Sequence, residues 1–328
     1  MDQLVPASEY VQRQAGPSEK YKFKFVGKPV EMAIMVFSNI LLTLVTLGIY
    51  NFWAKTRTRK YIRQHLEFAG DRFNYTGTGK ELFLGFIPVA LGLAGIILFQ
   101  VFLQKLFPAA AVAVSGLFSL GFGIAMPYLI YWSTAYKLSR TNWRNIRFGL
   151  SRKGTGSFVS SFLVGYILLI LTLGLYMPYW HENMARAMIG NMRFGSAHFV
   201  YHGTGKQIFF KFWAGIFLSI ITLGLFLPWH SARMMRYRFE NIQIQGAKAK
   251  LNVSGGEMFK LFLIGYFGII LSLGLAMPWI MHYSLCFFAE RIELEGALDF
   301  TAIAQIPEGE AGAGSDMAAD ALDISIGF

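Results

Sequence analysis

The sequence predicts a mainly α-helical membrane protein, a polytopic helical bundle built from repeats of about 50 residues, with short β-hairpins in the extramembrane loops. Three observations predict this fold. The 328 residues are 54% hydrophobic and only 15% charged, whereas a soluble domain has about 25% charged residues. Long apolar runs occur along most of the chain, and one short motif returns at a nearly constant spacing.

Six apolar runs are long enough to cross a bilayer, whose hydrocarbon core of about 30 Å requires about 20 helical residues. We predict spans near 30–53, 82–102, 109–132, 158–180, 207–229 and 258–281. With their connections they form an integral membrane domain over 21–302. Residues 1–20 are polar and lack the apolar core of a cleavable signal peptide, so we expect a disordered leader. Residues 303–328 are rich in Ala, Gly and acids and are expected to be a disordered acidic tail.

The repeated motif closes the apolar runs. It is most complete in Thr222-Leu223-Gly224-Leu225-Phe226-Leu227-Pro228-Trp229. Three successive intervals between its glycines are 51, 50 and 50 residues, and the copy at Gly123 is degenerate. The glycines, with the prolines and tryptophans that accompany them, are Gly48, Trp53, Gly123, Pro127, Gly174, Pro178, Gly224, Pro228, Trp229, Gly274, Pro278 and Trp279.

Two interpretations of this motif remain open at the sequence level. Proline removes a helical hydrogen bond and crowds the carbonyl four residues earlier, so Gly at that position leaves room for a kinked, continuous helix. Alternatively, the helix ends at Gly and Pro starts a new helix. In both cases we interpret the motif as structural, a helix exit whose aromatic side chains lie at the membrane–water interface.

Helix starts and hairpins are also visible in the sequence. Three segments match the capping box, in which a hydroxyl and an acid or amide three residues later satisfy helical N–H groups. These pairs are Thr78 with Glu81, Thr204 with Gln207, and Ser254 with Glu257. We therefore expect helices to begin near 79, 156, 205 and 255. Alternating residues predict a strand at 21–25 and β-hairpins around Gly195, Gly246 and Gly296.

Two arrangements of the loops on the two sides of the membrane are compatible with the sequence. The balances of Lys and Arg over Asp and Glu are +5 for 55–80, +6 for 133–157, +2 for 180–206 and +4 for 230–256. With six single crossings, three of these loops are cytoplasmic by the positive-inside rule and 180–206 is outside. If the motif instead turns the chain back, every basic hairpin lies in the cytoplasm. We favour single crossings.

No catalytic, cofactor-binding or metal-binding residues can be assigned. The chain has one cysteine, Cys286, and none of its six His forms an H-E-x-x-H pair. The Gly-Thr-Gly triplets are explained as turns with helix caps, and no nucleophile elbow, Walker or dinucleotide motif is present. We therefore predict a protein that is not an enzyme and has no cofactor. Nucleic-acid binding is not expected, because the basic residues adjoin apolar spans rather than a soluble basic face.

Several segments together resemble a known family. Phe23-x-Phe25-x-Gly27, Thr46 to Lys55 and Phe73-x-Tyr75-x-Gly77-Thr78-Gly79-Lys80 are similar to YjgN-like bacterial inner-membrane proteins, as are the later Thr-Leu-Gly-Leu-x-x-Pro-Trp copies. The resemblance covers 21–302 and implies a multi-pass protein of the bacterial inner membrane. It implies no activity, substrate or site residues.

Two functions follow as hypotheses. The first is a non-enzymatic transporter or channel for a small solute or lipid, since the apolar runs are numerous and rich in Gly. The second is a membrane scaffold whose basic loops bind anionic lipid or protein partners. The basic excess beside apolar segments favours anionic membrane lipids as partners. The sequence does not predict an oligomeric state.

Overall fold

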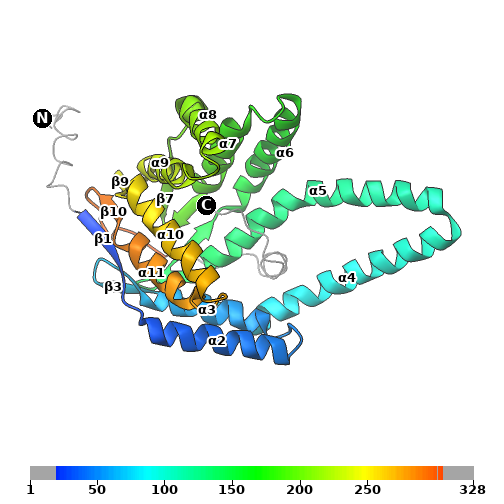
Figure 1. The fold of residues 1–328 in the computed structure, drawn as a ribbon, viewed down its shortest axis with the longest axis horizontal. Coiled ribbons are helices and arrows are strands. Elements are labelled where there is room, and N and C mark those ends of the chain that lie inside the picture. Colours follow the sequence, from blue (N-terminus) through cyan, green and yellow to red (C-terminus); the bar gives the residue numbers. More distant parts are fainter. Residues whose placement is uncertain (1–19, 301, 306–328) are drawn as a thin grey trace, which may run out of the picture.

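The structure is a computed structural model, and it describes residues 20–300 and 302–305. A small closed β-barrel forms one end of the molecule, and helical hairpins fan out from it (Figure 1). The polytopic helical bundle that the sequence predicts is therefore wrong. The predicted leader 1–20 and acidic tail 303–328 lie almost entirely outside the described residues.

Ten antiparallel strands in the described residues close the barrel. Each of the strands β2 to β9 pairs with its neighbours in sequence, and β1 closes the sheet by pairing with both β2 and β10. The strands are β1 Lys20–Phe25, β2 Leu66–Phe68, β3 Asp71–Tyr75, β4 Thr141–Trp143, β5 Ile146–Leu150, β6 Met192–Phe194, β7 Ala197–Tyr201, β8 Ile242–Ile244, β9 Ala247–Leu251 and β10 Ile292–Glu295.

Local sequence explains the hairpins of this barrel. In three hairpins both residues of the two-residue loop have positive φ, for example Gln245 at 48° and Gly246 at 86°. That geometry matches the right-handed twist of the flanking strands and closes a tight hairpin. The alternating residues expected on either side of Gly195 and Gly246 form the strand pairs β6–β7 and β8–β9.

The barrel interior is filled with aromatic side chains. Phe68, Phe73, Trp143 and Phe194 are buried there and pack on one another. Leu298 and Phe300 pack against this cluster, and Ile303 is buried in it. A small apolar cavity of about 110 Å³ remains among these groups. The barrel is therefore a packed core, and its strands hold the inner ends of the helical hairpins.

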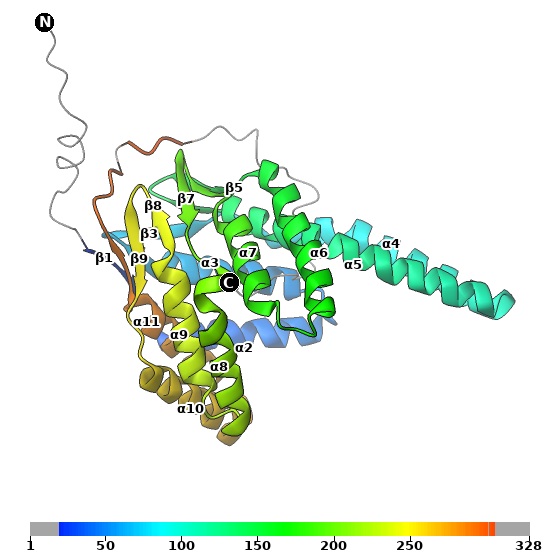
Figure 2. The same cartoon turned by 90° about the horizontal axis from the view of Figure 1, so that it is seen from above.

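Ten α-helices in the described residues form a closed ring, because each helix contacts the next and α11 contacts α2. Figure 2 shows from above how they spread away from the strands. They are α2 Pro29–Val45, α3 Asn51–His65, α4 Gly79–Leu106, α5 Pro108–Ser139, α6 Thr155–Leu171, α7 Met177–Ile189, α8 Gly205–Ile221, α9 Leu227–Glu240, α10 Gly255–Leu271 and α11 Met277–Ala289.

The Gly motif turns the chain back in four of these hairpins. At the end of α8, Leu223 has φ 50° and Gly224 has φ 89°. The Gly224 N–H donates to Ser219 O at 2.7 Å and the Leu223 N–H donates to Ile220 O at 3.1 Å. This is the Schellman arrangement that ends a helix. The same pair of bonds occurs at Gly48, Gly174 and Gly274.

Single crossings are therefore not observed at these four motifs. The apolar runs 30–53, 158–180, 207–229 and 258–281 each contain a turn, after which a second helix returns to the barrel. Pro178, Pro228 and Pro278 lie in the first turn of the returning helix. Only the degenerate copy follows the interpretation of a continuous helix: Pro127 lies inside helix α5, which also contains Gly123.

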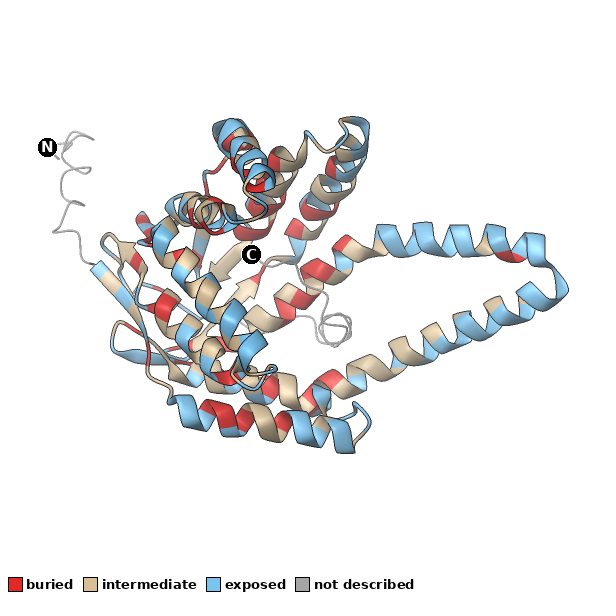
Figure 3. Ribbon diagram, viewed as in Figure 1, coloured by how far each residue is buried: buried red, intermediate tan, exposed pale blue. Residues whose placement is uncertain are grey.

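Burial differs between the barrel end of the molecule and the outer ends of the helical hairpins (Figure 3). Side chains near the barrel are buried, whereas most of α4, the distal half of α5 and the outer ends of the other hairpins are exposed. Within the described residues, three helical segments are long and apolar enough to cross a membrane, namely Gly79–Leu106, Pro108–Ser139 and Arg152–Leu171.

Candidate functional site

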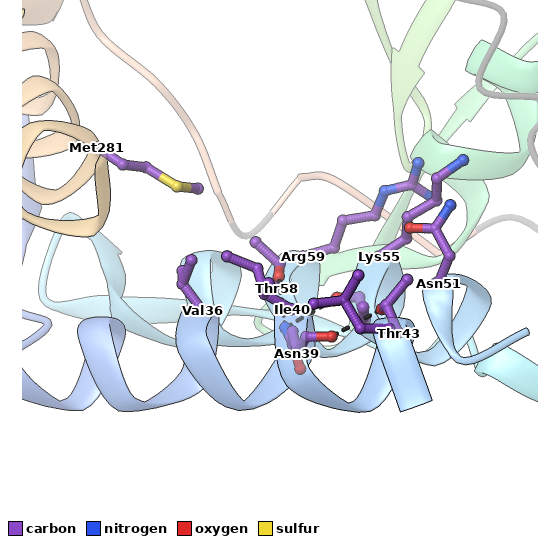
Figure 4. A pocket seen from close by; sticks show the side chains of 11 residues that line it. Val36, Asn39, Ile40, Thr43, Asn51, Lys55, Thr58, Arg59 and Met281 are labelled. Atoms are coloured by element: carbon purple, nitrogen blue, oxygen red, sulfur yellow. Dashed lines mark hydrogen bonds between the residues drawn. The ribbon is translucent and has the colours of Figure 1, made fainter. Parts of the chain in front are cut away.

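A cleft in the described residues lies between the hairpin α2–α3 and helix α11. Its volume is about 510 Å³, within the usual range of ligand sites. Figure 4 shows the side chains of α2 and α3 pointing toward the space that Met281 approaches from α11. The lining residues are Val36, Asn39, Ile40, Thr43, Leu44, Asn51, Ala54, Lys55, Thr58, Arg59 and Met281.

Asn39 fixes the two helices that form this cleft. It is buried near the middle of the mainly apolar helix α2. Its Nδ2 donates to Thr58 Oγ1 at 3.3 Å, and its Oδ1 accepts from Arg57 Nη1 at 3.3 Å. A buried amide needs such partners, because an unpaired polar group costs free energy in an apolar environment. The network holds α3 against α2 and so sets the shape of the cleft.

The cleft has an apolar wall and a basic end. Val36, Ile40 and Leu44 follow one face of α2, at the spacing of three and four residues that places side chains together on a helix. Lys55 and Arg59 lie one turn apart on α3. The lining contains no acidic side chain. Such a surface suits a molecule with an apolar part and a negatively charged group.

A second polar cluster lies on α7, away from this cleft. Glu182 is buried, and its Oε2 accepts from Tyr201 Oη at 2.5 Å. Arg238 Nε lies 4.0 Å from Glu182 Oε1. Burial raises the pKa of the Glu182 carboxyl, and the Tyr201 hydrogen bond and Arg238 oppose that shift. Because Tyr201 ends β7 and Arg238 lies on α9, this cluster connects the barrel to two helical hairpins.

The capping residues lie at the helix starts and differ in their bonding. Thr78 Oγ1 accepts from the Glu81 N–H at 3.2 Å. Ser254 and Glu257 form both bonds of the capping box. Thr204 makes no side-chain cap bond; its N–H donates to Tyr237 Oη, which donates in turn to Gln207 Oε1.

The aromatic residues of the motif pack between neighbouring hairpins. Trp53 lies against Gly79 at the start of α4, and Trp229 lies against Gly255 at the start of α10. In both places a Cβ on the glycine would overlap the indole. Trp279 is 45% exposed and its ring lies 6.0 Å from that of Phe37 on α2.

The motif and cap residues therefore do not meet at one site. None of them lines the cleft, whose residues come from α2, α3 and α11. Sequence inspection missed Lys55, Arg59 and Met281 as a group, because Met281 is more than 220 positions away from the other two. The one local signal was Asn39, a polar residue inside an apolar run. In the described part of the chain, no three His, Cys, Asp or Glu side chains gather as a metal site.

Comparison with known proteins places the chain in a family. A family model described as bacterial protein of unknown function (DUF898) matches residues 20–222, 198–271 and 216–321. The chain belongs to this DUF898 family. The match covers most of the chain, including the barrel, all ten described helices and the cleft.

The chain is also similar to the inner membrane protein YjgN of Escherichia coli K12, with 37% identity over 68 residues. That alignment covers 21% of this chain and 17% of YjgN. The YjgN of Salmonella typhimurium LT2 is 37% identical over 65 residues, covering 20% of this chain and 16% of the relative. The chain thus spans about a sixth of the length of the curated relatives that it matches. No solved structure matches it. The chain is a YjgN-like protein of the bacterial inner membrane.

Proposed function

We propose that this protein is a non-enzymatic carrier that binds an anionic amphiphile, such as a membrane lipid, in the cleft between α2, α3 and α11. The observation that carries the proposal is the polarity of the cleft, in which the basic side chains of Lys55 and Arg59 lie beside an apolar wall on α2. An acyl chain would contact Val36, Ile40 and Leu44. A phosphate or carboxylate would bind the two basic side chains.

The test is lipid binding by the full chain in nanodiscs. Lys55→Gln and Arg59→Gln each remove one positive charge from the cleft. Each is expected to weaken binding of an anionic phospholipid by about tenfold, which corresponds to a loss of about 1.4 kcal/mol of binding free energy. Native mass spectrometry of the nanodisc contents measures the retained lipid. Lys60→Gln is the matched control, since Lys60 is exposed on the same helix and does not line the cleft.

Two results would contradict the proposal. One is unchanged affinity in both cleft variants. The other is equal retention of zwitterionic and anionic lipids by the unaltered protein, because a basic site must prefer the anionic lipid.

A membrane scaffold is the second candidate. It is supported by the barrel, which brings the basic connections 55–80, 133–157, 180–206 and 230–256 around one sheet. Proteoliposomes containing a fluorescent anionic lipid in one leaflet distinguish the two functions. A carrier accelerates lipid exchange between leaflets, and this acceleration is lost in Arg59→Gln. A scaffold binds the lipid without moving it.

A further inference from the structure

The outer ends of four hairpins expose leucine almost completely. Leu47, Leu173, Leu223 and Leu273 are 93–94% exposed. Each has φ of 49–52°, which places the side chain at the very tip of the turn. The flanking residues Leu171, Leu175, Leu225 and Leu275 are also exposed. Four such apolar ends do not suit an aqueous surface.

Three of the four helices that return from these tips carry charge close to the turn, whereas α11 carries none before Glu290. Lys55 is the fifth residue of α3, Glu182 the sixth of α7 and Arg233 the seventh of α9. Charged groups are disfavoured at the bilayer centre and are tolerated near the headgroups. The first helix of each hairpin has 17 residues, or about 25 Å along its axis. That length is shorter than the bilayer's hydrocarbon core of about 30 Å, and the hairpins spread from the barrel in different directions (Figures 1 and 2).

The hairpin α4–α5 differs from the other four in its length and in its long uncharged segments. Its helices have 28 and 32 residues, or about 42 and 48 Å at 1.5 Å per residue. The chain has no charged residue between Glu81 and Lys105, or between Lys105 and Lys137. Gln100 Nε2 donates to Ser115 Oγ at 2.9 Å, so the hairpin satisfies a polar pair internally. It extends well beyond the other hairpins in Figure 1.

The barrel fixes which side each hairpin returns to. Both ends of every hairpin connect to strands of the same closed sheet. The basic connections therefore lie together on one side of any membrane that the tips enter, and the positive-inside rule makes that side cytoplasmic.

We infer that the partner of the leucine tips is the cytoplasmic leaflet of the bilayer. The hairpins α2–α3, α6–α7, α8–α9 and α10–α11 insert into this leaflet and leave on the same side. Among the described hairpins, α4–α5 crosses the membrane. The barrel lies in the cytoplasm. This arrangement is independent of what the cleft binds.

Cysteine labelling of the full chain in bacterial membranes tests the inference, in a Cys286→Ser background. Single cysteines replace Leu47, Leu173, Leu223 and Leu273 at the tips, and Phe107 at the outer end of α4–α5. Lys248→Cys is the barrel control, because Lys248 is exposed on β9. A membrane-impermeant maleimide is applied to spheroplasts, to inverted vesicles, and after detergent.

Phe107→Cys is expected to react in spheroplasts and Lys248→Cys only in inverted vesicles. The four tip cysteines are expected to react in neither preparation, with at least tenfold more labelling after detergent. Labelling of a tip in spheroplasts would show a crossing hairpin. Labelling of a tip in inverted vesicles would show that it is not inserted. An unreactive Phe107→Cys in spheroplasts would exclude the crossing of α4–α5.

A size-exclusion profile in detergent identifies any variant that fails to fold. The neighbouring exposed positions Ile49, Leu175, Leu225 and Leu275 then replace the failed tip position, with the same expected outcomes.

Discussion

At the scale of single residues, a hydroxyl group explains why Thr or Ser precedes Leu-Gly in the turning motifs. Thr222 Oγ1 donates to Leu218 O at 2.7 Å and accepts from the Phe226 N–H at 3.0 Å. It thus joins the last turn of α8 to the approach of α9. Thr46, Thr172 and Ser272 make the same two bonds. In the copy that does not turn, the corresponding residue is Gly121.

Thr222→Val tests this role, since valine has the shape of threonine without its hydroxyl. We expect the free energy of unfolding to fall by about 1–2 kcal/mol, because the Phe226 N–H and a helix-end carbonyl each lose a hydrogen-bond partner. Thr222→Ser keeps the hydroxyl and is expected to retain most of the stability. Thermal unfolding in detergent measures both variants. Equal midpoints for Val and wild type would show that the hydroxyl bridge contributes nothing.

Glu257 gives a pH-dependent prediction. Hydrogen bonds from the Ser254 backbone and Arg291 lower the pKa of its carboxyl to about 2. A carboxyl whose pKa is lower in the folded state stabilises the fold above its unfolded value of about 4.5, and this stabilisation is lost as the pH falls toward 2. Glu257→Gln should therefore cost stability at pH 7 and little at pH 2.5.

The size of this effect is small, about 1 kcal/mol or less, because the side chain is 41% exposed and solvent screens its charge. Unfolding midpoints of wild type and variant at pH 7, 4 and 2.5 provide the measurement. A difference that stays constant over this range would contradict the role of the ionised carboxyl.

At the scale of elements, contacts between hairpins depend on glycine at helix starts. The consecutive residues Gly255 and Gly256 provide a matched pair. A Cβ on Gly255 would overlap Trp229, whereas a Cβ on Gly256 meets nothing within 4 Å. Gly255→Ala should destabilise by about 1–3 kcal/mol through overpacking between α9 and α10. Gly256→Ala should be neutral or stabilise by up to about 1 kcal/mol, since alanine favours helix.

Both variants can be compared by thermal midpoint and by the fluorescence of Trp229 against a background lacking the other tryptophans. A shift in the emission of Trp229 is expected only in Gly255→Ala. Equal effects of the two substitutions would mean that Trp229 does not pack against the start of α10.

The local elements were largely predictable from the sequence, and their assembly was not. Alternation around Gly246 defines a hairpin because strand and turn preferences act over about ten residues. The runs at 207–229 and 258–281 reach the length of a membrane span, so hydrophobicity favours one crossing. The turn depends on the Thr222 hydroxyl and on Leu223 in a left-handed conformation. Leucine rarely adopts that conformation.

At the scale of the whole molecule, closure requires contacts between the two ends of the described chain. Strand β1 pairs with β10, about 270 positions later. The cleft has the same dependence, since Met281 on α11 reaches α2 only after the ring has closed. His282 Nε2 lies 2.7 Å from Gly27 O and joins the same two regions. Periodicity and motif spacing describe neighbours in sequence and cannot specify such pairs.

The closing strand pair contains a charge pair that can be tested. Lys22 lies opposite Glu293 in the register of β1 and β10, with Nζ and Oε1 3.1 Å apart. Glu293 is only 8% exposed, and Lys250 is opposite it on β9. Glu293→Lys therefore places like charges together at a nearly buried position. We expect the free energy of unfolding to fall by about 3 kcal/mol or more, and the barrel to open between β1 and β10.

The double variant Lys22→Glu with Glu293→Lys should recover part of that loss by restoring opposite charges on the two strands. Recovery is incomplete because Lys250 remains opposite position 293. The matched control is Glu295→Lys, which changes the more exposed pair of Lys20 and Glu295 on the same two strands and should cost about 1 kcal/mol or less. Limited proteolysis measures opening as cleavage next to β1. If Glu293→Lys is no more sensitive than Glu295→Lys, the ends of the chain do not depend on this pair, and closure rests on backbone pairing and the aromatic interior alone.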